Sequence, residues 1–263
     1  MNKIIKASLL FTSLGLAACS SSPTGRNQLI LFSDQDMSSL GAKSFEQMKI
    51  DTPISKDAKT NAYVQCVANT ITAYVPKQPN FSQWEVVVFD SDQVNAFALP
   101  GGKIGVYTGL LKVAVNQDQL ATVIGHEVAH VLADHSNERL SQSQLANAGL
   151  QITDIALGAS EYSQYRELTM AALGVGVQYG VLLPYGRTQE SEADIVGLEL
   201  MSKAGFDPKQ SIDLWKNMAK ASGGSAPPEL LSTHPSHSTR IQELANKIQT
   251  LPASSAKSPN CQI

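Results

Sequence analysis

Long apolar segments, an excess of positive charge and cysteine are all scarce or absent in this sequence. After Leu16, no run reaches the roughly 18 uninterrupted apolar residues that a membrane-spanning helix requires. The chain carries 20 Lys and Arg against 23 Asp and Glu, a formal net charge of −3, which gives no reason to expect a nucleic-acid partner. Its three cysteines, at positions 19, 66 and 261, leave room for at most one disulfide bond within the chain.

The first 18 residues have the order of features found in a bacterial secretion signal. Two lysines within the first six residues accompany the apolar stretch 4–16, which is too short and too interrupted to span a membrane. Leu16-Ala17-Ala18-Cys19 then resembles the cleavage site of bacterial lipoproteins, in which the thiol of the cysteine carries the lipid. By the same resemblance, Ser20 in place of Asp favours the outer membrane over the inner one. An ordinary secretory signal cut near Ala18 is the alternative.

These features predict a signal peptide over residues 1–18, a small polar tether over 19–32, and a mature protein held by a lipid on the periplasmic face of the outer membrane. Export would place Cys66 and Cys261 in an oxidising compartment, where two remaining cysteines usually pair. We therefore expect a disulfide bond that ties the C-terminal tail, residues 251–263, to an early helix. Two free thiols are the alternative.

The stretch His126-Glu127-Val128-Ala129-His130 has the pattern H-E-x-x-H. On a helix, positions i and i+4 lie on the same face, so both histidines can present a ring nitrogen to one metal ion. Imidazole suits zinc, and Glu127 lies beside that face, where it can act as a base toward a water molecule. Asn116, three residues before Gln119, and the polar run 134–137 predict where this helix begins and ends. Two histidines that are merely hydrogen-bonded on a buried helix are the alternative.

A third metal ligand has to come from elsewhere in the sequence. The metzincin pattern needs a glycine at position 133 and a histidine at position 136, where this chain has Ala133 and Ser136, so that class is excluded. His135 is one residue away from the required place. We expect it near the end of the helix, where the helix dipole favours it.

The stretch 190–194, with the sequence E-S-E-A-D, supplies better candidates. Glu190 and Asp194 lie four residues apart on one face of a helix, so Glu190 can bind the metal while Asp194 accepts the outer N–H of a ligand histidine. Glu192 is two residues from Glu190 and is expected to face elsewhere. A solvated acidic face is the alternative, although the apolar residues between 195 and 200 indicate a largely buried helix.

The rest of the sequence predicts a mostly helical α+β fold. Helices are expected over residues 33–48, 55–75, about 207–221 and around 240–248, with a strand over 84–89. A helical hairpin is predicted for residues 142–183. It is either a projecting lid or appendage or, as the more common arrangement, a helix pair that closes over the core.

Residues 95–107 predict two short strands around a Gly-Gly turn, and Pro100 suits an edge strand better than a central one. An extended peptide can pair with an exposed edge as an additional strand. The candidate substrate-binding residues are therefore Asn95, Ala96, Phe97 and Ala98. A plain structural hairpin is the alternative.

Four stretches together resemble the zinc metallopeptidase family that includes the CaaX prenyl protease, the heat-shock membrane protease HtpX and periplasmic chaperone-proteases of outer-membrane biogenesis. They are residues 95–107, H-E-V-A-H at 126–130, residues 186–194 and Thr233-His234-Pro235, and they occur in the family's order. The resemblance covers roughly residues 25–250. Because the chain lacks the transmembrane helices of the CaaX protease and HtpX, a prenylated substrate is not expected, and the lipoprotein signal indicates the periplasmic members.

The resemblance implies one zinc ion per chain, bound by His126, His130 and Glu190. It also implies Glu127 as the catalytic base and Asp194 as the partner of a ligand histidine. The implied fold is a gluzincin metallopeptidase domain over residues 33–250, with a small mixed sheet beside the H-E-x-x-H helix.

His234 is a further candidate catalytic residue, because a neutral loop histidine can take part in chemistry near pH 7. It could stabilise the oxyanion of the reaction, or it could occupy the open position on the metal and hold the enzyme inactive. A loop or N-cap histidine without a chemical role is the alternative.

Two functions fit these residues. The first is an endopeptidase that hydrolyses peptide bonds of misfolded or stalled envelope proteins, anchored to the membrane through Cys19. The second is a chaperone or assembly factor for outer-membrane proteins that cuts little and works beside the assembly machinery. The complete ligand set favours the first, because a pure binding module would be free to lose Glu127.

Overall fold

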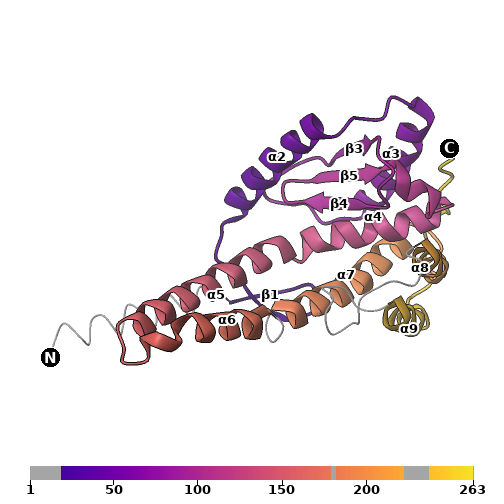
Figure 1. Ribbon diagram of the computed structural model, residues 1–263. Helices are drawn as coiled ribbons and strands as arrows, with labels where there is room; N and C mark the ends of the chain where they lie inside the picture. The colour runs from indigo at the N-terminus through magenta and orange to yellow at the C-terminus, as the bar shows by residue number, and fades with distance from the viewer. Residues whose placement is uncertain (1–18, 179–181, 222–236, 263) are drawn as a thin grey trace.

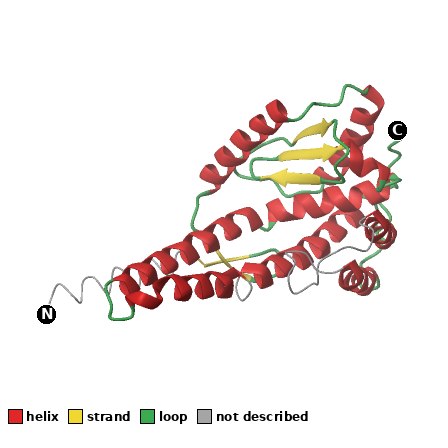
Figure 2. Cartoon of the chain, in the orientation of Figure 1, coloured by secondary structure: helices red, strands yellow, loops and turns green. Residues whose placement is uncertain are grey.

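The computed structural model describes residues 19–178, 182–221 and 237–262. A mixed three-stranded sheet is built from β3 (Glu85–Phe89), β4 (Ala96–Leu99) and β5 (Lys103–Tyr107), in the order β3-β5-β4. Strand β3 is parallel to β5 and β4 is antiparallel to it, so β4 forms one edge. Helices make up most of the rest (Figure 2), and the predicted mostly helical α+β fold with a small mixed sheet is confirmed.

The two faces of the sheet pack on different helices, as the alternation of side chains along a strand requires. Helix α2 (Asp34–Asp51) covers one face through Phe45, which packs with Phe89 and Tyr107. Helices α3 (Ala58–Thr72) and α4 (Gln117–Leu132) cover the other face, and a 3-10 turn, η1 (Thr108–Lys112), leads from β5 toward α4 (Figure 1). The predicted helix and strand bounds in this region differ from the observed ones by a few residues.

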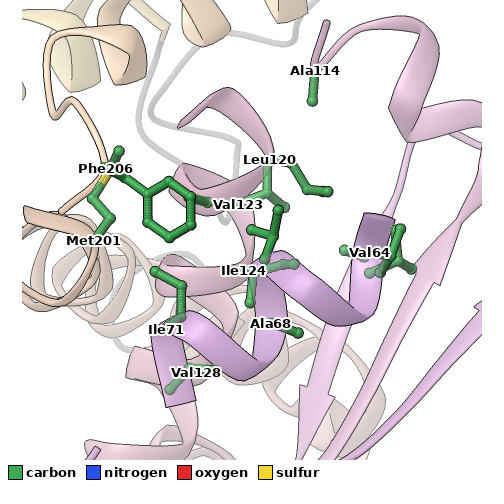
Figure 3. Packing of buried hydrophobic residues seen from close by; sticks show 14 of the residues in the cluster. Val64, Ala68, Ile71, Ala114, Leu120, Val123, Ile124, Val128, Met201 and Phe206 are labelled. Atoms are coloured by element: carbon green, nitrogen blue, oxygen red, sulfur yellow. The ribbon is translucent and has the colours of Figure 1, made fainter. Parts of the chain in front are cut away.

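Helix α4 is the central element, because the main core surrounds it. Its buried Leu120, Ile124 and Val128 pack with Ile71 and other residues of α3, and with Phe206 beyond the end of α7 (Leu183–Lys203) (Figure 3). Each buried aliphatic side chain contributes about 1.5–3 kcal/mol relative to exposure. Asn116 caps the helix by accepting the backbone N–H of Gln119, as the sequence predicts.

Helices α4 and α7 approach to backbone contact at two glycines. A Cβ added at Gly125 would lie 2.8 Å from the carbonyl oxygen of Gly197, and one added at Gly197 would lie 2.6 Å from the backbone nitrogen of His126. Neither position has room for a side chain. The contact fixes how closely α7 approaches the H-E-x-x-H motif.

Helices α5 (His135–Gly158) and α6 (Arg166–Val177), joined through the short turn η2 (Ser163–Tyr165), form a hairpin that projects from the body (Figures 1 and 2). No described residue of α6 is buried. The expectation that this pair closes over the core is therefore wrong, because α5 runs outward beyond the sheet, where no core remains to be covered. Exposed apolar side chains on the hairpin include Leu145, Ile152, Ile155, Leu168 and Val175. Among the described residues, no helix combines the length and apolar character needed to cross a bilayer.

Helices α8 (Gln210–Ala221) and α9 (His237–Ile248) pack beside α7 and α4. The expected disulfide is present: Cys66 of α3 is bonded to Cys261, across a sequence separation of 195 residues. The backbone N–H of Cys261 also donates to Gln117 at the start of α4. The C-terminal tail is thereby fixed to the helix that carries the motif.

Residues 19–29, within the predicted tether, pack against the body of the protein. Strand β1 (Cys19–Ser21) pairs antiparallel with β2 (Asn27–Leu29), which makes a small hairpin against the start of α5. The buried Gln28 donates to the carbonyl of Ala133 at 2.6 Å, and Arg26 forms ion pairs with two buried carboxylates. This stretch is mostly small and polar, and that composition does not indicate that Arg26 and Gln28 have buried partners. The predicted signal peptide, residues 1–18, lies outside the described residues.

Candidate metal centre

The three predicted ligands meet between α4 and α7. His126 and His130 lie one turn apart on α4, and their Nε2 atoms are 3.1 Å apart. The Glu190 carboxylate of α7 lies 3.3 Å from Nε2 of His130 and 3.5 Å from Nε2 of His126. All three residues are buried, and their donor atoms lie within 4.8 Å of one another. The structure thus brings together the residues that sequence spacing placed on two separate helices.

Two imidazole nitrogens and one carboxylate are a donor set that zinc accepts in catalytic sites. Burial and the Arg240 guanidinium lower the pKa of His126, but hydrogen bonds with Asp194 and Glu190 outweigh them and raise it to about 9. Burial lowers the pKa of His130 to about 4, so this ring is neutral, as a metal ligand must be, and the residues fit zinc.

Asp194 fixes the orientation of His126, as the sequence predicts. Its Oδ1 lies 2.9 Å from Nδ1 of His126, so Nε2 of the ring is left for the metal. Arg240 of α9 holds the carboxylate through two hydrogen bonds of 2.7 and 2.5 Å, and its guanidinium stacks 3.5 Å from the ring centre of Trp215. Burial raises the pKa of Asp194, but Arg240 and His126 outweigh burial and hold it below its usual value.

Sequence reasoning missed Arg240. A single arginine on a helix of mixed composition carries no local signal, and only the fold shows that it reaches Asp194, 46 residues earlier in the chain.

Glu127 lies beside the ligands, half-buried, at the edge of the sheet. Burial raises its pKa, and the negative charge of Glu190 adds to the increase, while His126 and Arg240 oppose it. The backbone of Ala98 on β4 lies near this carboxylate and also lowers its pKa. The predicted base is therefore next to the predicted substrate strand, Asn95 to Ala98.

Within the described part of the chain, no other strand pairs with the outer side of β4. The N–H of Tyr107 donates to the carbonyl of Asn95, and hydrogen-bonded pairs alternate along an antiparallel ladder. The backbone groups of Phe97 consequently face β5, whereas those of Ala96 and Ala98 face the open edge. The edge thus offers backbone groups beside Glu127.

His135 and Glu192 are placed differently from expectation. His135 does not lie at a helix end in favourable contact with the C-terminal dipole. It is the fully buried first residue of α5, and its Nδ1 lies 2.8 Å from Nδ1 of His130. Glu192 faces away from the three ligands, as expected, but it is buried, and its carboxylate lies 3.1 Å from Nε2 of His135. The alternative of a solvated acidic face is wrong for both Glu190 and Glu192.

His234, with Thr233 and Pro235, lies outside the described residues, and its two candidate roles remain predictions.

Comparison with known proteins places these observations in a family. The profile of Peptidase family M48 matches residues 57–248. The mitochondrial metalloendopeptidase OMA1 of Bos taurus is 33% identical over 235 residues, which cover 84% of this chain and 44% of the relative. OMA1 of Arabidopsis thaliana is 40% identical over 162 residues, covering 62% of this chain and 31% of the relative.

A bacterial relative is also similar. The Beta-barrel assembly-enhancing protease of Yersinia pestis is 27% identical over 219 residues, 81% of this chain and 44% of the relative. The chain spans less than half the length of each of these three curated relatives.

Proposed function

The chain belongs to peptidase family M48, and from this membership we propose that it is an active zinc-dependent endopeptidase that hydrolyses peptide bonds of misfolded or stalled proteins in the bacterial cell envelope. One observation carries the proposal: His126, His130 and Glu190 converge in a buried pocket with Glu127 beside them. Members of this family are zinc-dependent, and the pocket has a donor set that zinc accepts.

The chain's own residues supply the acid–base chemistry. His126, His130 and Glu190 would hold the zinc ion, which when bound would act as a Lewis acid toward the scissile carbonyl and make a water molecule more acidic. Glu127 takes the proton of the attacking water and passes it to the leaving amine. The raised pKa of Glu127 suits this transfer, because it makes the carboxylate a stronger base toward the water, and the protonated carboxyl is still acidic enough to protonate the leaving amine.

Strand β4 is proposed to hold the substrate. An extended peptide that pairs with the outward backbone groups of Ala96 and Ala98 would lie alongside Glu127. Main-chain pairing gives affinity without reading side chains. Such recognition requires an extended segment, which unfolded proteins offer and folded ones rarely do. The proposed preference for misfolded clients rests on this requirement.

The proposed location rests on the N-terminus and the disulfide. The lipoprotein-like signal ending at Cys19 would place the protein on the periplasmic face of the outer membrane. A disulfide between Cys66 and Cys261 suits an oxidising compartment such as the periplasm. The name of the bacterial relatives, Beta-barrel assembly-enhancing protease, supports outer-membrane proteins and their assembly machinery as candidate partners.

A second function is favoured by the projecting hairpin of α5 and α6. Its exposed apolar side chains could hold clients without cutting them, as a chaperone or assembly factor does. The intact Glu127 site favours the peptidase.

The test compares wild type with Glu127→Gln in zinc content and in cleavage of casein, an unfolded model substrate. The amide keeps the shape of the side chain and removes the base, so we expect one zinc per chain in both proteins and cleavage by wild type alone. Glu199→Gln serves as the control, because this residue lies on α7 in an ion pair with Lys247, away from the ligands. Equal turnover by wild type and Glu127→Gln, both fully loaded with zinc, would refute the proposed mechanism.

His234→Ala separates the two roles proposed for that residue. Loss of an oxyanion donor lowers kcat by about 100- to 1,000-fold, whereas removal of a ligand that blocks the metal raises cleavage. An unchanged kcat at saturating zinc would assign His234 no chemical role.

A further inference from the structure

We propose that His135 and Glu192 are positioning residues of the metal centre, joined to His130 in one hydrogen-bonded chain whose far end is fixed by Arg26 of the N-terminal hairpin. The proposal rests on the zinc site of the proposed function. It extends that site beyond the three ligands, because residues 19–29 become a structural part of the metal centre.

The distances define an unbroken chain of contacts. Nδ1 of His130 lies 2.8 Å from Nδ1 of His135, and Nε2 of His135 lies 3.1 Å from the Glu192 carboxylate. His135 is fully buried, and His130 and Glu192 are 7% and 4% exposed, so water cannot readily replace these partners. A polar group buried to this degree needs a partner within the protein.

Only one arrangement of protons satisfies every contact. Nε2 of His130 faces His126 and Glu190, so it must be free of a proton to bind the metal, and the ring proton is then on Nδ1. That Nδ1–H donates to Nδ1 of His135, which acts as the acceptor. His135 consequently carries its own proton on Nε2 and donates it to Glu192. Glu192 therefore selects the tautomer of His135, and His135 selects the tautomer of His130.

The two ligand histidines are then held by parallel arrangements. His126 donates to Asp194, and Asp194 is held by Arg240. His130 reaches Glu192 through His135, and Glu192 is held by Arg26 at 3.0 Å. In both cases the arrangement ends in a carboxylate of α7 and an arginine from a distant part of the chain. Such partners orient a ligand ring and raise its basicity.

A break between two helices makes the contact of His130 with His135 possible. Residues five apart on a continuous helix do not face each other. Here α4 ends at Leu132 and α5 begins at His135, and Asp134 between them adopts a left-handed conformation with φ of 50°. The break turns His135 back under His130.

Residues of the N-terminal hairpin hold the far end of the chain. Glu192 accepts hydrogen bonds from the hydroxyl of Thr24 at 2.5 Å and from Nε of Arg26 at 3.0 Å. Arg26 also binds both oxygens of the fully buried Glu138, at 2.6 and 2.7 Å. A buried carboxylate requires such compensation, so loss of the hairpin would leave Glu192 without its cation and with His135 as its remaining partner among these residues.

Zinc affinity in the full chain tests the proposal, measured by competition with a chromophoric chelator. His135→Leu removes the acceptor for His130 and should weaken zinc binding by about 10- to 100-fold. His135→Asn keeps an acceptor near the Nδ1 position and should recover part of the loss. The control is Glu199→Gln, which alters another carboxylate of α7, one that pairs with Lys247 and does not touch His135, and it should leave zinc affinity within about twofold.

Wild-type zinc affinity in a folded His135→Leu protein would overturn the proposal. A second measurement does not depend on any variant being folded. In the zinc-loaded wild-type chain, labelled with ¹⁵N-histidine, NMR should show His135 protonated on Nε2 alone and His130 on Nδ1 alone. A proton on Nδ1 of His135 would overturn the chain of donors. Neither readout depends on cleavage, so an inactive protein with these properties would refute only the proposed function, and a wild-type chain that binds no zinc would refute both.

Discussion

Gly125 and Gly197 bring the backbones of α4 and α7 into contact one residue ahead of His126. A Cβ at Gly197 would lie 2.6 Å from the backbone nitrogen of His126 and 2.7 Å from the carbonyl carbon of Gly125. Because the atoms in the way are backbone, the helices would have to separate to admit a methyl group. The distance between the histidines on α4 and Glu190 on α7 is therefore set by two residues that bind nothing themselves.

Gly197→Ala should weaken zinc binding and destabilise the fold by about 1–3 kcal/mol, the usual cost of overpacking. Urea unfolding and zinc stoichiometry measure the two effects. Gly149→Ala is the matched control, since a Cβ at this helical position meets nothing within 4 Å. Alanine there should stabilise α5 by about 0.5–1 kcal/mol and leave zinc binding unchanged. Full zinc occupancy with unchanged affinity in Gly197→Ala would show that the helix contact does not set the ligand geometry.

Removal of the metal should abolish cleavage, and substitution of one ligand residue should nearly abolish it. In Glu190→Gln the amide oxygen replaces a carboxylate, so zinc affinity should fall further than the roughly 10- to 100-fold seen when a partner of a ligand is lost. Glu199→Gln on the same helix should match wild type. Chelator competition measures the zinc affinities. Cleavage is measured after dialysis against a chelator and again after zinc is added back. A Glu190→Gln protein that keeps wild-type affinity would assign the third ligand elsewhere.

The parts of the site that the sequence predicts are those set by helix periodicity. His126, Glu127 and His130 follow from one turn of α4, and Glu190 and Asp194 from one turn of α7. These relationships hold wherever a helix forms, so they need no knowledge of the fold. The disulfide could be predicted by elimination, because only two cysteines remain once Cys19 is assigned to the predicted lipoprotein signal.

The parts that could not be predicted depend on contacts between distant segments. The bond from Arg26 to Glu192 joins residues 166 apart in the sequence, and that from Arg240 to Asp194 joins residues 46 apart. His135 was misplaced because its position depends on the left-handed residue Asp134, for which an aspartate in a polar run gives only a weak signal. The sequence predicts the two helices of the hairpin, but no local pattern indicates that they project away from the core.

Loss of the disulfide should destabilise the fold without altering the metal centre. A crosslink across a sequence separation of 195 residues stabilises by about 5 kcal/mol in the chain-entropy model. The double variant Cys66→Ala, Cys261→Ala should therefore unfold at a lower urea concentration, and wild type should do the same in the presence of reductant. Zinc affinity at 25 °C should remain within about twofold for whatever fraction is folded, because neither cysteine contacts a ligand. Reductant-insensitive unfolding of wild type would contradict the prediction.

The proposed lipid anchor and the N-terminal hairpin should have separable effects. Cys19→Ala removes the proposed site of acylation. Each buried methylene of an acyl chain contributes about 0.8 kcal/mol to membrane binding. Without the acyl chains, the protein should move from the membrane to the soluble periplasmic fraction or remain unprocessed. Unchanged fractionation with normal processing would indicate a different anchor.

The same variant keeps Thr24 and Arg26, which contact Glu192, so zinc affinity and casein cleavage by the purified protein should stay within about twofold of wild type. Arg26→Leu should show the opposite pattern. Its membrane fractionation should be normal, because Cys19 is intact, while zinc affinity should fall by about tenfold, because Glu192 loses its cation and no longer holds His135 firmly. If instead Cys19→Ala loses zinc while Arg26→Leu keeps it, the lipid, and not the hairpin's contact with Glu192, would be what supports the metal centre.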